Sequence, residues 1–195
     1  MDPATTRNAV REAYSQAARE PEGAHPFPVG RRFAKSVGYP SALLKTIPKR
    51  SVESFSGVSN VSLFSEIRDG MTVLDLGCGA GLDAVVASRR VGPKGRVVGV
   101  DFSPDMAAKA GRTAAEIGAE NLDVVMAGGE DLPLETGSID AVIANGIFNL
   151  NPFHDRLFRE LARVVKPGGT VWSAEIILKE PLPEAHRQSE AAWFA

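Results

Sequence analysis

The sequence predicts an α/β fold, with a doubly wound and mostly parallel β-sheet covered by helices on both faces. From Met71 onward, short apolar runs alternate with longer helical patterns, which is typical of repeated strand-helix units. A glycine-rich turn joins the first strand of that region to its first helix. The chain has 195 residues, 44% of them hydrophobic, so it can bury the core of one compact domain.

The first 66 residues are expected to form a helical cap or lid on a domain at residues 67–195. Apolar residues recur at helical spacing from Asn8 to Arg19, and a stretch containing Pro and Gly then ends the pattern. One or two further short helices are expected between Arg31 and Ser59, one of them beginning near Pro40. We predict no second core in this half of the chain.

The strand-helix region divides into elements in a regular order. We expect strands at residues 72–76, 96–101, 122–126, 139–144 and 170–177, and helices at residues 82–91, 104–117 and 153–164. Ser103 as N-cap and Pro104 at the first helical position mark the start of the second helix, and Gly118 marks its end. The sequence Lys166-Pro-Gly-Gly is interpreted as the end of the last helix.

The composition narrows the expected partners and compartment. Lys and Arg total 22 against 24 Asp and Glu, so no global positive field would attract nucleic acid. The polar start is unlike a secretion signal, and the apolar runs are shorter than the roughly 20 residues of a membrane-spanning helix. Cys78 is the single cysteine, which excludes an internal disulfide. We predict a cytoplasmic protein without a metal, a nucleic-acid partner or a membrane partner.

The strongest motif is Asp75-Leu-Gly77-Cys-Gly79-Ala-Gly81, where a strand turns through three glycines into a helix. Glycine is needed where a ligand approaches the backbone so closely that a Cβ atom would collide with it. The following helix presents unpaired N–H groups to the ligand. Asp101 ends the next strand, where its carboxylate is placed to accept hydrogen bonds from the ribose hydroxyls of an adenosine group.

The glycine spacing distinguishes two classes of protein that share this layout. Dinucleotide-binding proteins have Gly-x-Gly-x-x-Gly, whereas this chain has Gly-x-Gly-x-Gly with Asp75 just before the turn. A carboxylate would repel a pyrophosphate but would favour the amino group of a methionine moiety. The motif therefore resembles that of the class I S-adenosylmethionine-dependent methyltransferases, which have a Rossmann-like fold. A dinucleotide oxidoreductase is one alternative, and a turn without a ligand, which leaves Asp101 unexplained, is the other.

The resemblance implies S-adenosyl-L-methionine as the cofactor. The segment Gly128-Gly-Glu-Asp-Leu-Pro133 is similar to the one that holds the adenine. Gly128 stands where many relatives carry an acid, so Glu130, Asp131 or the main chain must serve instead. The tip of the fourth strand, Asn145, would meet the methionine end of the cofactor. The expected cofactor-binding residues are Asp75, Gly77, Cys78, Gly79, Gly81, Asp101, Phe102, Met106, Gly129, Glu130 and Asn145.

Other segments resemble the arsenite methyltransferase group within that superfamily. They are Val91-Gly-Pro-Lys-Gly-Arg-Val-Val-Gly-Val-Asp101, Ser103-Pro-Asp-Met106, Asn149-Leu150 and Val10-Arg-Glu-Ala-Tyr14. That group binds trivalent arsenic through cysteine thiolates, because soft metalloids prefer sulfur ligands. Where such cysteines would be expected, this chain has Gly57 or a neighbour, Ala84 and Gly146.

We therefore expect a methyltransferase that acts on a small-molecule acceptor rather than on arsenite. The acceptor side of the site is expected to include Tyr14, Phe148 and Asn149. No residue is assigned as a catalytic acid or base, because the methyl group of the cofactor is already activated for transfer.

The carboxyl end departs from the usual class I pattern. Such domains usually continue past the fifth strand with a helix and an antiparallel strand pair, whereas about one helix fits here after Pro183. The fifth strand is then expected to be an exposed edge, which invites pairing with another chain. Either the sequence is truncated, or a partner such as the second copy of a homodimer covers that edge. A truncated, catalytically weak cofactor-binding protein or subunit is the alternative function, and a true arsenite methyltransferase is a further, less favoured one.

Overall fold

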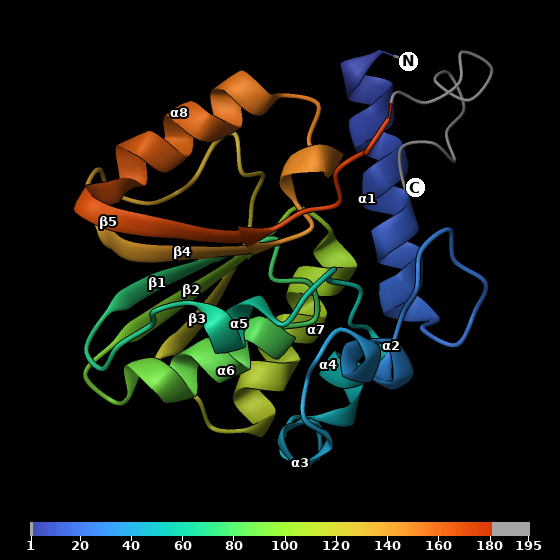
Figure 1. The fold of residues 1–195 in the computed structure, drawn as a ribbon, viewed down its shortest axis with the longest axis horizontal. Coiled ribbons are helices and arrows are strands. Elements are labelled where there is room, and N and C mark those ends of the chain that lie inside the picture. The colour runs from blue at the N-terminus through green and yellow to red at the C-terminus, as the bar shows by residue number, and fades with distance from the viewer. Residues whose placement is uncertain (1, 181–195) are drawn as a thin grey trace.

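The computed structural model describes residues 2–180 and confirms the α/β fold (Figure 1). Within that range the sheet has five strands in the order β3-β2-β1-β4-β5, and every neighbouring pair is parallel. The strands are β1 Thr72–Leu76, β2 Arg96–Asp101, β3 Leu122–Met126, β4 Ile139–Asn145 and β5 Val165–Ala174. The strand order changes direction between β1 and β4, and sheets of this kind bind ligands outside the carboxyl ends of the strands at that point.

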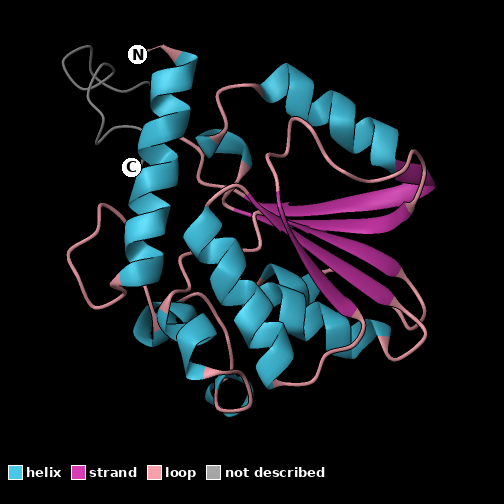
Figure 2. Ribbon diagram, turned by 180° about the vertical axis from the view of Figure 1, so that it is seen from behind, coloured by secondary structure: helices cyan, strands magenta, loops and turns pink. Residues whose placement is uncertain are grey.

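Helices cover both faces of the sheet (Figures 1 and 2). On one face lie α6 Leu82–Val91 and α7 Pro104–Glu116, and on the other lies α8 His154–Val164. The strands alternate accordingly, because successive side chains point to opposite faces. Val73 packs in the core on the α6 side, whereas Leu74 packs in the core beneath α8.

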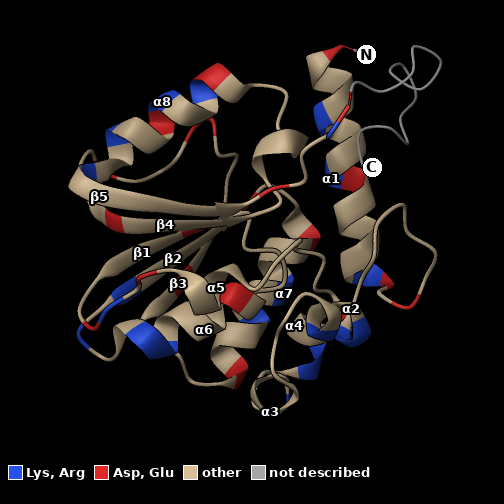
Figure 3. Ribbon diagram, viewed as in Figure 1, with Lys and Arg blue, Asp and Glu red and all other residues tan. Residues whose placement is uncertain are grey.

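Two helices follow directly from local sequence signals, one from its apolar stripe and one from its N-cap. Helix α8 buries Leu157, Leu161 and Val164 on one stripe, and its Asp, Glu and Arg residues lie at the other positions along the helix (Figure 3). In α7 the Ser103 hydroxyl accepts a hydrogen bond from the Met106 N–H at 3.2 Å, as the predicted N-cap requires. These local signals therefore mark where the two helices lie in the chain.

The N-terminal helix is longer than its apolar pattern indicated. Helix α1 spans Pro3–Arg19, so it begins at Pro3 rather than at Asn8. Asp2 is the N-cap, and its carboxylate accepts a hydrogen bond from the Thr5 N–H at 3.1 Å. Proline at the first helical position has no N–H to lose, which explains the start.

The rest of the cap consists of four short helices, α2 Arg31–Ser36, α3 Ser41–Leu44, α4 Lys49–Glu53 and α5 Val61–Phe64. Three of them lie between Arg31 and Ser59, where one or two were predicted. Leu44, Val52 and Phe55 are buried in the same cluster as Val73 of the sheet. The cap is thus packed onto the sheet through a shared core.

The last described strand differs from the prediction. The sequence suggested a strand at 170–177 after a helix end at Lys166, but α8 stops at Val164 and β5 begins at Val165. The pairing shifts between Ile139 and Ala141, and this irregularity accommodates the Pro-Gly-Gly segment within the strand. Two predictions fall on residues that the structure does not describe, namely the helix after Pro183 and the lack of a final strand pair.

The outer edge of β5 has no partner strand within residues 2–180. Pairing of this edge with a second copy of the chain stays a prediction. Across the same residues, no helix has the length and apolar character needed to span a bilayer.

Candidate functional site

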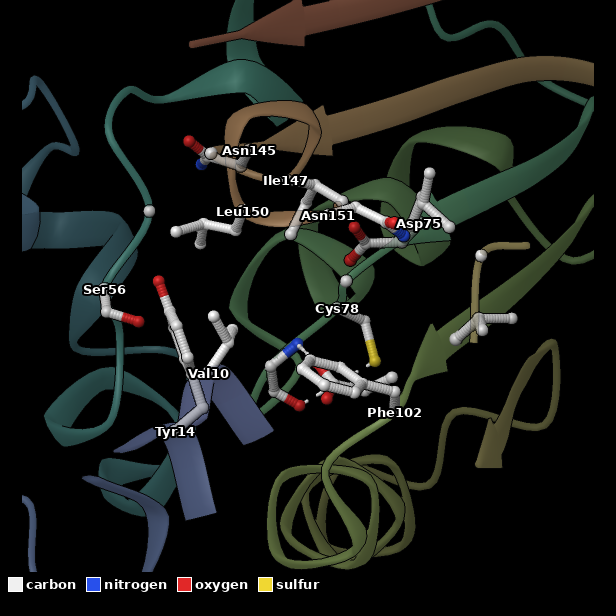
Figure 4. A pocket seen from close by; sticks show the side chains of 18 of the residues that line it. Val10, Tyr14, Ser56, Asp75, Cys78, Phe102, Asn145, Ile147, Leu150 and Asn151 are labelled. Carbon is white, nitrogen blue, oxygen red and sulfur yellow. Dashed lines mark hydrogen bonds between the residues drawn. The ribbon is translucent and has the colours of Figure 1, made fainter. Parts of the chain in front are cut away.

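A pocket lies at the carboxyl ends of β1, β2 and β4, where the strand order changes direction (Figure 4). The loop after β1 and the tips of β2 and β4 form its floor. Helix α1, cap residues 51–57 and the segment after β4 form its walls. The predicted residues that line it are Tyr14, Asp75, Gly77, Cys78, Gly79, Asp101, Phe102, Gly129, Glu130 and Asn145.

Glycines shape the loop after β1. Gly77 and Gly79 have φ angles of 70° and 53°, in the left-handed region that favours glycine. A Cβ atom at Gly77 would overlap the side chain of Ile147, whereas one at Gly79 would project into open space. The backbone at Gly79 is therefore accessible to a ligand.

Gly81 lies where two helices pack together behind the glycine loop. It is the N-cap of α6 with φ 89°, and a Cβ atom there would lie 3.3 Å from the Cβ of Ala110 in α7. Gly81 does not line the pocket. Its lack of a side chain lets α6 and α7 pack closely behind the loop.

Asp101 is buried at the tip of β2 and anchors the glycine loop. Its Oδ2 accepts a hydrogen bond from the Gly79 N–H at 2.8 Å, and its Oδ1 accepts one from the Ser103 N–H at 2.8 Å. Burial raises the pKa of Asp101 to about 6, and the two hydrogen bonds oppose that rise. A carboxylate has about four lone-pair positions, so each oxygen can still accept a hydrogen bond from a ligand hydroxyl.

Asp75 is a buried acid of the pocket with one unpartnered oxygen. The residue is 1% exposed, and its Oδ2 has no hydrogen-bond partner among the described residues. Burial raises the pKa of Asp75 well above its usual value, and the neighbouring Asp83 and Asp101 carboxyls raise it further. A buried carboxyl oxygen without a partner is costly, so Asp75 is a candidate to accept a hydrogen bond from a ligand.

Asn145 lies in the pocket wall, but its amide group holds the cap. Its Oδ1 accepts hydrogen bonds from the Val58 and Ser59 N–H groups at 2.8 and 3.0 Å. Its Nδ2 donates to the Ser59 carbonyl at 2.7 Å and to Asp83 at 2.9 Å. All four hydrogen-bonding positions of the side chain are thus used by the protein. A contact with the methionine end of a cofactor stays a prediction, and the structure assigns Asn145 a structural role.

Asp83 is the second carboxyl group of this network. It accepts hydrogen bonds from the Tyr39 hydroxyl, from the Ser62 N–H at 3.3 Å and from Asn145. Burial raises its pKa, and these hydrogen bonds oppose the rise. Asp83 therefore links α6 to two cap segments and to β4.

The cap forms the wall opposite the glycine loop. Figure 4 shows Tyr14 on the same side of the pocket as Val10 and Ser56, with its ring extending from α1 along the pocket. The ring stacks on Phe27 with centroids 4.4 Å apart, which holds its orientation. Burial and the nearby Asp101 carboxyl raise the pKa of Tyr14, so it stays a neutral hydroxyl.

Besides Gly81, three predicted residues are not brought into the pocket. Met106 is fully buried beneath α1, in a small core with Ala17 and Ala18. Phe148 and Asn149 belong to the short 3-10 helix η1, Phe148–Leu150. Phe148 packs against Phe158 of α8, with ring centroids 5.1 Å apart.

The turn of η1 instead places its neighbours in the wall. Ile147, Leu150, Asn151 and Pro152 line the pocket, whereas Phe148 and Asn149 do not. Glu175, which follows β5, fixes this turn by accepting hydrogen bonds from the N–H groups of residues 147, 148 and 149 at 3.0 to 3.3 Å. No local pattern distinguishes which of these residues faces the pocket, because the direction depends on Glu175.

Sequence reasoning missed several lining residues of the cap. They are Arg7, Val10, Ser51, Ser54, Phe55, Ser56 and Gly57. No sequence signal within residues 51–57 indicates a ligand. Arg7 lies on the N-terminal turn of α1 that the apolar pattern did not include.

The pocket is electrically asymmetric. Four carboxyl groups line it, Asp75, Asp83, Asp101 and Glu130, whereas Arg7 is the one Lys or Arg among the described lining residues. Because Arg7 is paired with Glu130 at 2.7 Å, the acids around the glycine loop face the cavity without a cationic partner. This arrangement suits a ligand with a positive charge and hydroxyl groups, and it disfavours a pyrophosphate.

Comparisons with known proteins agree with this geometry. Residues 67–194 match the family model described as a methyltransferase domain. The chain is 39% identical over 128 residues to the arsenite methyltransferase of Halobacterium salinarum. That alignment covers 66% of this chain and 33% of the Halobacterium protein. It is 39% identical over 126 residues to the demethylmenaquinone methyltransferase of Lactococcus lactis. That alignment covers 64% of this chain and 49% of the Lactococcus protein. The chain thus spans about a third to a half of the length of these curated relatives.

A solved structure supports the same relationship. The arsenic (III) S-adenosylmethionine methyltransferase from Chlamydomonas reinhardtii superposes with a TM-score of 0.70 and 33% sequence identity, over 78% of this chain and 55% of that chain. The family match covers more than half of this chain and includes the glycine loop and both strand-tip acids. The chain therefore belongs to the methyltransferase-domain family and is a member of the class I S-adenosylmethionine-dependent methyltransferases.

Proposed function

We propose that this chain transfers a methyl group from S-adenosylmethionine to a small-molecule acceptor that is not arsenite. The observation that carries the proposal is the buried, unpartnered Asp75 carboxyl oxygen beside the open backbone of Gly79. Asp75 fits the ammonium group of the cofactor, and Asp101 fits its ribose hydroxyls. The bound cofactor would supply a methyl group already activated by its sulfonium.

The walls of the pocket support a small acceptor. Helix α1 and the 51–57 segment stand against the carboxyl ends of the strands, so the space beside the glycine loop is bounded by the cap. Val10, Ile147 and Leu150 give this space apolar walls that exclude water, and Tyr14 and Ser56 add hydroxyl groups. Holding the acceptor in a reactive orientation is the main contribution such a wall can make, worth up to about 7–11 kcal/mol.

Arsenite is disfavoured by the contacts at the expected thiolate positions. A Cβ atom at Gly57 would overlap the amide of Asn145, and one at Gly146 would lie 3.2 Å from the Val58 side chain. Cys78 is buried in the cofactor loop, and burial raises the pKa of its thiol, which disfavours the thiolate needed to bind arsenic. The cap loop packs where cysteine side chains would project.

Titration calorimetry and turnover assays test the proposal. The chain should bind S-adenosylmethionine and its demethylated product, and a panel of phenols, amines, carboxylic acids and thiols should show methylation of at least one class. Binding without turnover would identify a cofactor-binding subunit. Absence of binding, or tight binding of a nicotinamide cofactor, would overturn the proposal. Saturable binding of arsenite would contradict the choice of acceptor.

Replacing Asp101 with Ala should weaken S-adenosylmethionine binding by about 1.5–3 kcal/mol, the scale for hydrogen bonds to a charged group. The change removes the ribose acceptor and the hydrogen bond that holds the Gly79 N–H. Calorimetric dissociation constants measure the effect. Asp123→Ala is the matched control, because this exposed acid lies on β3 and pairs with Arg96. Equal affinities for Asp101→Ala and the unmodified protein would contradict the assignment.

Cofactor affinity should rise with pH between about 5 and 7. The pKa of Asp101 is raised from 3.8 to about 6 and that of Asp75 is also raised, so binding of the cationic ligand must release protons below neutral pH. The stability of the ligand-free protein should change in the opposite direction. A folded carboxyl with a raised pKa holds extra protons between its ordinary and raised values, so stability falls as pH rises through that window. Calorimetry in two buffers of different ionisation enthalpy measures the proton release, and an affinity independent of pH would contradict it.

A further inference from the structure

Arg7 extends from α1 across one end of the pocket. Its Nε donates to Glu130 Oε1 at 2.7 Å, and its guanidinium carbon lies 5.7 Å from the centre of the Phe102 ring. Phe102 follows Asp101 at the tip of β2, and Glu130 lies in the loop after β3, where the adenine contact is expected. The Glu130 side chain is 9% exposed and that of Arg7 is 35% exposed, so this ion pair is partly shielded from water.

Glu130 connects three separate segments. Its Oε1 is bound to Arg7 of α1, and its Oε2 accepts a hydrogen bond from Asn151 Nδ2 at 3.3 Å. Asn151 follows η1 on the opposite wall of the pocket (Figure 4). The carboxylate therefore bridges α1 and the segment after β4 across this end of the site.

Gly128 makes room for this bridge. A Cβ atom at that position would lie 2.6 Å from Arg7 Nη2 and 2.8 Å from Glu130 Oε2. Any side chain there would displace the guanidinium or the carboxylate. Glycine at position 128 therefore leaves the Arg7–Glu130 pair undisturbed.

The remaining polar contacts of α1 with the body of the domain lie near its other end. Ser15 shares a hydrogen bond of 2.8 Å with Ser103, the Ala18 carbonyl accepts one from Lys109 at 2.5 Å, and Arg19 pairs with Asp105 at 3.3 Å. Among the described residues, Arg7 makes the one ion pair between the first two turns of α1 and the sheet domain. The N-terminal half of α1 therefore depends on Arg7 for its polar attachment.

We propose that Arg7, Glu130 and Asn151 form a strap that holds α1 over the nucleoside end of the pocket and slows release of the cofactor. Arg7 is a positioning residue in this view, and the inference rests on the proposed function. Loss of the strap should raise the dissociation rate constant, because α1 can then move away from the pocket more often. The association rate constant should change little, since an open pocket admits the ligand at least as readily.

Stopped-flow measurement of S-adenosylhomocysteine release from the full chain tests the strap. Arg7→Met keeps the aliphatic stem and removes the charge, and Glu130→Gln keeps the shape. Each should raise the dissociation rate constant about 10-fold, and the double variant should be no worse than either alone, because both remove the same interaction. Arg7→Lys keeps the positive charge, so it should raise the dissociation rate constant by less than Arg7→Met does. Arg11→Met is the matched control, since Arg11 is exposed on the next turn of the same helix.

The outcomes separate the strap from the proposed function. If the unmodified chain binds neither S-adenosylmethionine nor its product, the proposed function fails. If it binds and Arg7→Met releases the ligand at the unmodified rate, the strap is wrong. A faster association rate in Arg7→Met with unchanged release would show that Arg7 obstructs entry, which also overturns the strap. In turnover assays the strap predicts a higher KM for S-adenosylmethionine without a loss of kcat, whereas general destabilisation would lower kcat.

Discussion

Replacing Asp75 with Asn is expected to stabilise the ligand-free fold and to weaken S-adenosylmethionine binding by about 3–5 kcal/mol, the cost of breaking a buried ion pair. That loss corresponds to more than two orders of magnitude in the dissociation constant. The two effects have opposite signs because one buried carboxyl group causes both. Residues that serve a ligand are often unfavourable for the fold alone.

The stability gain follows from the raised pKa of Asp75. In the folded state burial disfavours the charged carboxyl group, whereas in the unfolded chain water solvates it. The free energy of unfolding therefore falls as pH rises from the ordinary pKa through the raised one, and Asn removes that dependence. Denaturant unfolding should show Asp75→Asn to be more stable at pH 8 and to lose this advantage in acid.

The binding loss is best tested with a ligand that lacks the charged tail. Methylthioadenosine has the nucleoside and sulfur but no amino group, so Asp75→Asn should bind it about as tightly as the unmodified chain does. S-adenosylmethionine should distinguish the two proteins strongly. Equal losses for both ligands would show that the substitution disturbs the pocket as a whole, and unchanged affinity for both would remove Asp75 from the site.

The first two strand-helix units were predictable because their signals are local. The glycine loop ends β1, and Ser103 with Pro104 starts α7. The carboxyl ends of parallel strands meet at one edge, so the positions of Asp75 and Asp101 followed from the sequence as soon as the strands were assigned. The floor of the site was therefore predicted and its members line one pocket.

The walls of the site were much less predictable. Phe148 and Ile147 are both apolar and adjacent, and a turn fixed by Glu175 decides that Ile147 faces the pocket. Arg7 contacts the site through residues that are far away in the sequence, such as Phe102 and Glu130. Periodicity carries no information about such partners.

Asn145 illustrates the same limit at a strand tip. Its position at the end of β4 predicted a ligand contact, but residues 58 and 59 of the cap occupy its hydrogen-bonding groups. The cap loop is separated from β4 by more than eighty residues, so the sequence pattern could not reveal this pairing. A polar residue at a strand tip can therefore serve the lid that covers the site as well as the ligand within it.

Replacing Asn145 with Ala is accordingly expected to lower the free energy of unfolding by about 3–5 kcal/mol, a large part of the stability of an ordinary domain. The change removes a donor from the buried Asp83 carboxyl and leaves the Val58 and Ser59 N–H groups without their acceptor. Each of these buried or partly buried groups costs up to about 1–3 kcal/mol when it is left without a partner, and a charged group costs more. Denaturant unfolding measures the total.

The same substitution should loosen the cap more than the sheet. Amide hydrogen exchange should accelerate at Val58 and Ser59 by more than at the strands, because the lost hydrogen bonds hold the cap loop to β4. Asn149→Ala is the matched control, since Oδ1 of this nearby, partly buried asparagine has no hydrogen-bond partner among the described residues. If Asn145→Ala unfolds within about 1 kcal/mol of the control and exchanges at the same rates, the cap is held by its shared apolar core alone.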